Sequence, residues 1–290
     1  MGRNTAVALE TTVVVIAYRR PSLVKLQMRG LAGARPPALL VACDVPPSGN
    51  CTDVEKIYSA IRDGVTWPCD VSFDVAPHHL GLNDRVTTAI DLALGSAAAA
   101  IVLEDDCVPH PDFFRFATCL LERYRRDDRV HMIAGGRPRS APRWGTASYY
   151  FSRYPFIWGW STWADRWNRA SFTTRPWTSA DERLLQHHFT GHELEYWRRM
   201  TAKSVTGWGS WDYRWFLEML QSDGLCAVPN VNLVRNVGFG AGATHTSDPA
   251  DYPSRSIPVA AMERGITHTD VVERDQPADF QAFREVFLRG

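Results

Sequence analysis

The stretch Ala97-Ala98-Ala99-Ala100-Ile101-Val102-Leu103-Glu104-Asp105-Asp106 decides the fold, because an apolar run of strand length ends there in three consecutive acids. Such a run is typical of a buried strand in a parallel sheet, and ligands of open α/β sheets bind at the carboxyl ends of these strands. Three neighbouring carboxylates repel one another unless a cation joins them. Mg²⁺ and Mn²⁺ take one or two carboxylate oxygens and fill their other positions with water and substrate phosphates. The stretch therefore predicts a metal-diphosphate site at a sheet edge.

A plainer interpretation is that these acids only cap the following helix. Pro109 and Pro111 are suited to a helix start, and Asp residues stabilise a helix start without any ligand. On this stretch alone, both interpretations stand.

The first half of the chain alternates between strand and helix patterns. This alternation predicts an α/β fold, with a Rossmann-like sheet of parallel strands, right-handed crossovers and flanking helices. The expected strands are 12–18, 38–42, 70–75, 97–103 and 130–134, and the expected helices are 23–31, 51–62, 83–94 and 111–126.

Composition and charge exclude several classes of protein. The chain has 290 residues, of which 45% are hydrophobic and 22% charged, which is typical of a globular protein that can hold one large α/β domain. Its formal net charge is zero, and Lys25, Lys56 and Lys203 are the only lysines among 32 basic residues. Because no basic stripe stands out, we expect no nucleic-acid partner.

The cysteines and the N-terminal residues bear on the compartment. The six cysteines form no C-x-x-C pair and have no metal-ligand spacing, which favours a reduced cytosolic protein. The first residues do not resemble a signal peptide, and 11–17 is too short an apolar run to cross a bilayer. We therefore expect a cytoplasmic location, with peripheral contact at the inner membrane face left open.

The second half of the chain is rich in tryptophan, with ten of the 11 Trp residues lying between Trp144 and Trp215. Most large aromatic side chains in proteins are substantially buried, so we expect most of these to belong to the core. Alternatively, some of them line a cleft and stack against carbohydrate, since Trp offers a flat apolar face with one polar atom. The tail after Gly238 is rich in Gly, Pro and Thr and is expected to form loops.

Sugar transfer from a nucleotide needs a neutralised diphosphate leaving group and a base that deprotonates the incoming hydroxyl. Asp106 is the candidate for direct metal binding, and Glu104 and Asp105 are candidates for hydrogen bonds to ribose, sugar or metal-bound water. The candidate base is Asp212, because its neighbours Trp211 and Tyr213 would raise the pKa of a carboxylate. Alternatively, Asp212 only interacts with the dipole of a helix that begins there.

Four further positions are candidates for contacts with the nucleotide sugar. Arg20 and Asp44 follow the first two strands, where polar groups suit a nucleobase or ribose, with turn capping as the alternative. Arg85 lies near a predicted helix start, which together with a cation suits phosphate, unless it is only solvated. His245 lies in a Gly-rich segment from which an imidazole could reach phosphate or metal.

These pieces, taken in order, resemble the GT-A-fold glycosyltransferases, and among them the bacterial relatives of N-acetylglucosaminyltransferase I. The similarity runs from about residue 11 to residue 245. The pieces are Val14-Val15-Ile16-Ala17-Tyr18-Arg19-Arg20, Leu103-Glu104-Asp105-Asp106, Pro111-Asp112-Phe113-Phe114, Gly159-Trp160, Trp211-Asp212, and Phe239-Gly240 ahead of Thr244-His245.

The resemblance implies a GT-A fold with one mixed sheet, a nucleotide-sugar-binding half at 1–136 and an acceptor-binding half with C-terminal loops at 137–290. It implies Mn²⁺ (or Mg²⁺) on Asp106, Asp212 as the catalytic base, and a UDP-sugar donor, with N-acetylglucosamine or a close relative as the sugar. The segment around His245 falls where donor binding orders a lid in that family. Single displacement would invert the anomeric carbon.

The acceptor stays open, because 46–70 and the tail after Ser247 have no clear counterpart in the family. A glycan, a lipid-linked glycan and a small natural product are all compatible with the sequence. Two alternative functions also remain. A sugar-nucleotidyltransferase shares the sheet and the metal chemistry, although Arg19-Arg20-Pro21-Ser22 lacks the glycines usual after its first strand. A non-catalytic carbohydrate-binding protein rests on the tryptophans alone.

Overall fold

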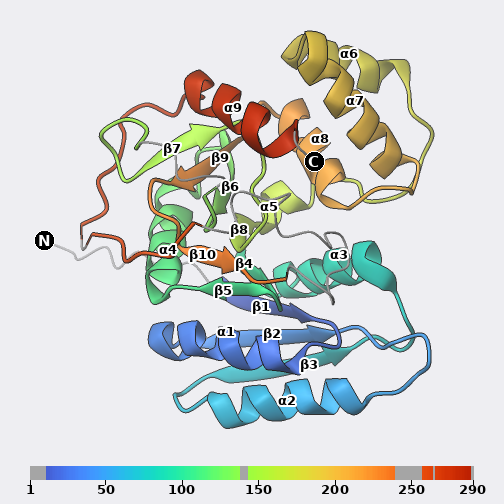
Figure 1. The fold of residues 1–290 in the computed structure, drawn as a ribbon, viewed down its shortest axis with the longest axis vertical. Coiled ribbons are helices and arrows are strands. Elements are labelled where there is room, and N and C mark those ends of the chain that lie inside the picture. The colour runs from blue at the N-terminus through green and yellow to red at the C-terminus, as the bar shows by residue number, and fades with distance from the viewer. Residues whose placement is uncertain (1–10, 138–142, 239–256, 264, 289–290) are drawn as a thin grey trace, which may run out of the picture.

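The computed structural model describes residues 11–137, 143–238, 257–263 and 265–288. Within them, one eight-stranded sheet runs through the molecule, with helices packed on both sides (Figure 1). In order across the sheet, the strands are β3 (Asp70–Val75), β2 (Ala38–Cys43), β1 (Thr11–Ala17), β4 (Ala99–Glu104), β8 (Trp160–Trp163), β6 (Val130–Ala134), β9 (Leu225–Pro229) and β7 (Tyr149–Ser152).

The sheet is mixed in strand direction. The strands β3, β2, β1 and β4 are parallel, as the alternating pattern predicts. The strand β8 lies antiparallel between β4 and β6, while β9 is parallel to β6 and β7 is antiparallel to β9. A separate two-stranded sheet pairs β5 (Cys107–Pro109) with β10 (Val234–Asn236) in antiparallel fashion. The predicted α/β fold with one mixed sheet and flanking helices is therefore confirmed.

The helices complete the layers on the two faces of the sheet. They are α1 (Pro21–Ala34), α2 (Thr52–Gly64), α3 (Gly81–Leu94), α4 (Pro111–Tyr124), α5 (Ala164–Trp167), α6 (Ser179–His188), α7 (Gly191–Val205), α8 (Asp212–Gln221) and α9 (Gln276–Ala282), which continues as a π-helical turn (Phe283–Phe287). The helices expected in the first half are all present, with bounds that differ by a few residues. The expectation of loops in the tail is wrong for 276–287. The missed signal is a helix start, because Asp275 accepts a hydrogen bond from the amide of Ala278 and Pro277 occupies the first turn.

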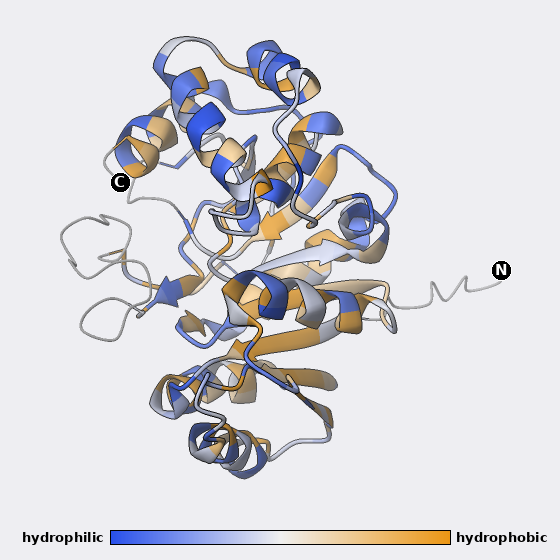
Figure 2. Ribbon diagram, turned by 90° about the vertical axis from the view of Figure 1, so that its right-hand side faces the viewer, coloured by the Kyte–Doolittle hydropathy of each residue, from blue (hydrophilic) through white to orange (hydrophobic). Residues whose placement is uncertain are grey.

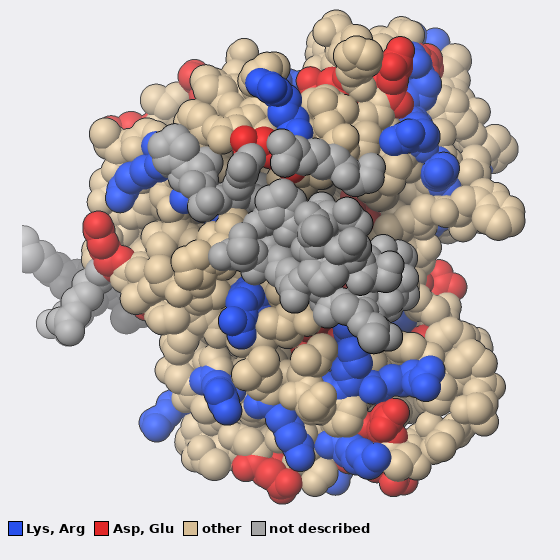
Figure 3. Space-filling view, in the orientation of Figure 1, with Lys and Arg blue, Asp and Glu red and all other residues tan. Residues whose placement is uncertain are grey.

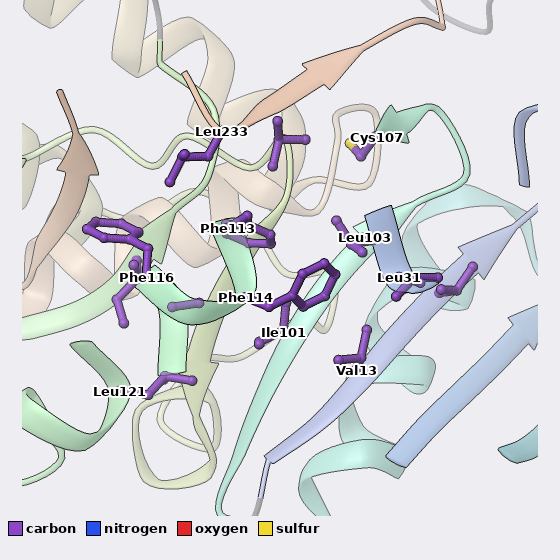
Figure 4. Packing of buried hydrophobic residues seen from close by; sticks show 14 of the residues in the cluster. Val13, Leu31, Ile101, Leu103, Cys107, Phe113, Phe114, Phe116, Leu121 and Leu233 are labelled. Atoms are coloured by element: carbon purple, nitrogen blue, oxygen red, sulfur yellow. The ribbon is translucent and has the colours of Figure 1, made fainter. Parts of the chain in front are cut away.

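Alternate residues along the central strands face two different cores. Val13 and Val15 of β1 face the core under α1, α2 and α4, whereas Val14 and Ile16 face the core under α3, α5 and α8. The strands are accordingly the most hydrophobic part of the ribbon (Figure 2). In the first core, Phe114 of α4 lies beside Ile101 and Leu103 of β4, and Phe113 packs next to Phe114 (Figure 4). Burial of each such side chain stabilises the fold by about 1.5–3 kcal/mol.

Most of the tryptophans in the second half belong to the core, as predicted. Trp160 of β8 stacks on Trp211 with ring centroids 5.7 Å apart, and Trp167 lies 5.4 Å from Trp215 of α8. A third core joins α6, α7, α8 and α9 around the fully buried Trp197. These contacts hold the second half of the chain onto the sheet.

Two further findings concern the cysteines and the apolar helices. All six cysteines lie in the described residues, and each is a free thiol. Across the described parts of the chain, no helix has both the length and the apolar content needed to cross a bilayer.

Candidate functional site

The three consecutive acids lie where β4 ends, next to the end of β1. Ile16 of β1 is opposite Glu104 in the parallel ladder. The side chain of Gln27, fully buried in α1, donates to the carbonyl oxygens of Glu104 at 2.9 Å and Cys107 at 2.8 Å. One amide group therefore holds both ends of the turn that carries Asp105 and Asp106.

Asp105 is the structural member of the three acids. It is 1% exposed, and its carboxylate accepts a hydrogen bond of 2.9 Å from the amide of Tyr18 and an ion pair from Arg20. Burial raises the pKa of Asp105 to about 6, although Arg20 and the Tyr18 amide oppose the shift. Asp105 thus fixes the loop that leaves β1.

Arg20 lies over two of the acids instead of pointing away from them. Arg19 adopts the left-handed region at φ 59°, and the chain turns there before α1 begins. The Arg20 guanidinium then pairs with Asp105 and lies 3.1 Å from Oδ2 of Asp106. The sequence suggested a nucleobase contact for Arg20, and the structure adds that its charge faces the acids.

Asp106 is partly exposed and lies under the strand β10. Nδ2 of Asn236 is 3.4 Å from Oδ1 of Asp106, and the amide of Val237 donates to the Asp106 carbonyl at 2.9 Å. A Cβ atom at Gly238 would lie 2.1 Å from Oδ2 of Asp106, so a larger residue there would displace this carboxylate. The chain therefore passes directly over the carboxylate that the sequence assigns to a metal.

The pKa of Glu104 reflects the negative charge that gathers at this site. The Glu104 residue is partly exposed to solvent. Its pKa is raised to about 8, first by burial and then by the charges of Asp106, Asp105 and Asp212. Asp212 therefore lies within electrostatic reach of Glu104, although more than 100 residues separate the two in the sequence.

Asp212 is the first residue of α8, and its position is set by a contact between two helix starts. Oδ1 of Asn83, in the first turn of α3, accepts the amide of Trp211 at 2.8 Å, and Nδ2 donates to the carbonyl of Gly209 at 2.8 Å. The buried Trp211 ring packs on Trp160. Asp212 itself lines a cleft of about 1280 Å³. Its place in the first turn also satisfies the dipole interaction that the sequence left as an alternative.

Asp44 and Arg85 are both engaged by neighbouring protein groups. The Asp44 carboxylate accepts the amides of Val45, Leu80 and Gly81 at 2.9–3.0 Å and pairs with His79, and so caps the turn into α3. Gly81 has φ 79°, which this turn requires.

Arg85 points to the end of β3, where it pairs with Asp74 at 2.5 Å. For Asp44, the turn-capping alternative is thus present in the structure. Nucleotide contacts by either residue stay predictions, and His245 lies outside the described residues.

Several side chains at the site are not predicted by the sequence patterns. Gln27, Asn83 and Asn236 were missed, because a single amide side chain has no pattern that marks its partner. Tyr196, Arg199, Met200 and Lys203 also line the cleft, and their spacing of three and four residues along α7 was a readable signal.

The residues at the end of β4 fit a divalent ion that is shared with a substrate. In the described part of the chain, no group of three His, Cys, Asp or Glu side chains forms a complete metal cage. Mg²⁺ and Mn²⁺ are commonly held by one or two carboxylates plus substrate phosphates, and Asp106 and Glu104 are partly exposed carboxylates in a region of excess negative charge. The donor set therefore suits an ion that arrives with a diphosphate.

Comparisons with known proteins give similar folds. No protein-family model and no curated protein matches the chain. A structure of S. aureus TarS 1-349 is similar with a TM-score of 0.46 and 10% identity, over 78% of this chain and 59% of that one. A longer S. aureus TarS structure gives 0.44 and 10%, over 76% and 35%.

UDP-glucose pyrophosphorylase complexed with UDP-glucose is similar with a TM-score of 0.35 and 12% identity, over 55% of this chain and 78% of that one. The chain spans less than two thirds of the length of either TarS structure. At these identities and TM-scores, the likenesses assign no family and no activity to this chain.

Proposed function

We propose that this protein is a GT-A-type glycosyltransferase that moves a sugar from a UDP-sugar to a hydroxyl group of an acceptor. The observation that carries the proposal is that Asp212, at the start of α8 and in the lining of a large cleft, lies within electrostatic reach of Glu104 at the end of β4. A diphosphate leaving group and a general base are the two needs of such a reaction, and these residues have the chemistry for both.

In the proposed reaction, each acid has a separate role. Asp106, with Glu104 beside it, would hold Mn²⁺ or Mg²⁺, which when bound neutralises the charge of the departing diphosphate. Asp105 has no free oxygen for this purpose, because Arg20 and the Tyr18 amide engage its carboxylate, and it orients the turn. Arg20 supplies positive charge near the leaving group.

Asp212 would accept the proton of the incoming hydroxyl. The oxygen then attacks the anomeric carbon from the face opposite the leaving group, the bond to UDP breaks, and the configuration inverts. By the resemblance to N-acetylglucosaminyltransferase I relatives, N-acetylglucosamine is the sugar that we expect. In this account, residues 1–136 bind the donor, 137–290 bind the acceptor, and the enzyme works in the cytoplasm.

The experiment is a turnover assay that separates chemistry from donor binding. Wild type and Asp212→Asn are given UDP-N-acetylglucosamine, Mn²⁺ and a pool of simple sugars, and released UDP is measured. We expect release by wild type and a loss of more than about 100-fold in Asp212→Asn, since general bases contribute that much. Both proteins should show the same thermal shift with UDP-N-acetylglucosamine.

Two results would contradict the proposal. Undiminished UDP release by Asp212→Asn would show that Asp212 is not the catalytic base. Formation of UTP from UDP-N-acetylglucosamine and pyrophosphate would favour the sugar-nucleotidyltransferase instead. Asp63→Asn, an exposed acid on α2, is the matched control and should behave as wild type.

A further inference from the structure

One face of α7 lines the cleft and carries two cations. Tyr196, Arg199, Met200 and Lys203 recur at spacings of three and four residues, so they share a single helix face. Both cations are exposed, and neither forms an ion pair with any residue in the described ranges. The adjacent Arg198, in contrast, is paired with Glu182.

These two cations are like charges four residues apart on one helix face. Like charges four residues apart on a helix destabilise it by about 0.2–0.5 kcal/mol. The other arginines of the cleft lining form hydrogen bonds with the backbone. Arg214 donates to the carbonyl of Ser204, and Arg137 donates to the carbonyl of Asn230. Arg199 and Lys203 are therefore the positive groups of the lining that remain available to an anion.

Trp208 adds a flat apolar surface to the same cleft. It is 87% exposed, in a half of the chain where the other tryptophans of the lining and core are buried or half-buried. A single exposed apolar side chain is ordinary in itself, and Trp208 bears on ligand binding because it lines the same cleft as the two cations.

The loop that carries Trp208 is fixed in place. The amide of Trp208 donates to the Lys203 carbonyl at 2.8 Å, and Oγ of Ser204 donates to the Ser210 carbonyl at 2.6 Å. A Cβ atom at Gly209 would lie 2.7 Å from the nitrogen of Ser204, so the loop packs closely on the end of α7. The backbone that carries the exposed ring is thus fixed relative to the end of α7, which lowers the entropy cost of ordering the loop on binding.

We propose that this cleft binds the acceptor, and that the acceptor is an anionic saccharide. A sugar ring stacks on Trp208, and its phosphate or carboxylate group binds Arg199 and Lys203. The lining also holds two acids, Asp84 and Asp212, in the first turns of α3 and α8. Figure 3 shows Lys and Arg side chains on the surface that α6 and α7 form, beside an indentation at the right-hand edge.

The assignment of this ligand as acceptor rests on the proposed function, but binding itself does not. The test is affinity electrophoresis of the full chain in gels that contain phosphomannan, polygalacturonate or neutral dextran. We expect retardation by an anionic polysaccharide and none by dextran. The phosphomannan and polygalacturonate gels tell whether phosphate or carboxylate is the preferred anion.

The variants that test the site are Trp208→Ala and the double variant Arg199→Gln/Lys203→Gln. Each should weaken binding to the anionic polysaccharide by about tenfold or more, as expected for loss of charge-assisted hydrogen bonds or of an aromatic contact. The matched control is Lys25→Gln/Arg29→Gln, an exposed pair of the same spacing on α1. Circular dichroism and thermal unfolding check that each variant folds.

Equal retardation by dextran would overturn the proposal, and so would an unchanged affinity of the double variant or an equal loss in the α1 control. The same proteins are titrated with UDP and Mn²⁺ to separate the two proposals. If the variants keep UDP binding but lose polysaccharide binding, the result supports both the saccharide site and the proposed function. A wild type that binds the polysaccharide but not UDP would refute the proposed function and leave the saccharide site standing.

Discussion

Glu104 is the single residue whose protonation most directly reflects the site. Its pKa of about 8 lies far above the ordinary value of 4.5, because burial and three neighbouring acids disfavour its charge. Between these two values the folded protein binds more protons than the unfolded chain. Stability contributed by this group is therefore present at low pH and falls as pH rises through that window.

We predict that replacing Glu104 by Gln removes this loss of stability with rising pH. Partial exposure screens the charge, so the expected size is about 1–2 kcal/mol. The free energy of unfolding, measured by urea titration without metal at pH 5 and pH 8, should fall more steeply for wild type than for Glu104→Gln. A difference between the two proteins that stays constant with pH would show that Glu104 is not crowded by like charge.

Arg20 and Asp44 show what single residues in a sequence can reveal. Their positions after the first two strands correctly predict that they lie at the edge of the sheet. Their partners depend on turn geometry, such as the left-handed Arg19 and the Gly81 turn, which no spacing rule encodes. The acids after β4 were easier to interpret, because a buried strand fixes both their location and their crowding.

Among the helices and strands, the contact between the starts of α3 and α8 does the most to position Asp212. Asn83 makes this contact with two hydrogen bonds of 2.8 Å to the Gly209 and Trp211 backbone. We predict that Asn83→Ala lowers the free energy of unfolding by about 1–3 kcal/mol, because the Trp211 amide loses its partner. Chemical denaturation measures this loss.

The same variant should reduce UDP release by more than it reduces UDP binding, since it displaces the proposed base and leaves the β4 acids in place. Asn50→Ala, whose side chain bonds only within an exposed turn, is the control. Equal losses of UDP binding and UDP release in Asn83→Ala would argue against a positioning role.

Elements differ in how well the sequence predicts them. The β-branched runs and periodic helices of the first half are found within a few residues of their predicted bounds. The strands β7, β8 and β9 were missed, since they are four or five residues long, lie in aromatic-rich segments and gain their stability from long-range pairing. Insertion of the antiparallel β8 between β4 and β6 has no local signal at all.

For the whole molecule, acid sensitivity centres on His131 in β6. Its side chain is fully buried and both ring nitrogens lack hydrogen-bond partners among the described residues. Its pKa is lowered from 6.5 to about 4, first by burial and then by the charges of Arg169 and Arg166. The unfolded chain therefore binds more protons between these values, and stability is lost as pH falls through that window.

We predict a loss of about 3 kcal/mol in the free energy of unfolding of wild type from pH 7 to pH 4 that is due to this residue. His131→Leu should show a correspondingly flatter profile, whatever its absolute stability, when unfolding by urea is followed across that range. A parallel profile for the two proteins would mean that other groups govern acid unfolding.

The most direct test of the account is a calorimetric titration of UDP into wild type, Asp106→Ala and the control Asp63→Asn, each with and without Mn²⁺. We predict that Mn²⁺ strengthens UDP binding to wild type and to the control by at least about tenfold, and that Asp106→Ala loses this gain. UDP binding that is the same with and without Mn²⁺, or that survives unchanged in Asp106→Ala, would contradict a metal-diphosphate site at the end of β4.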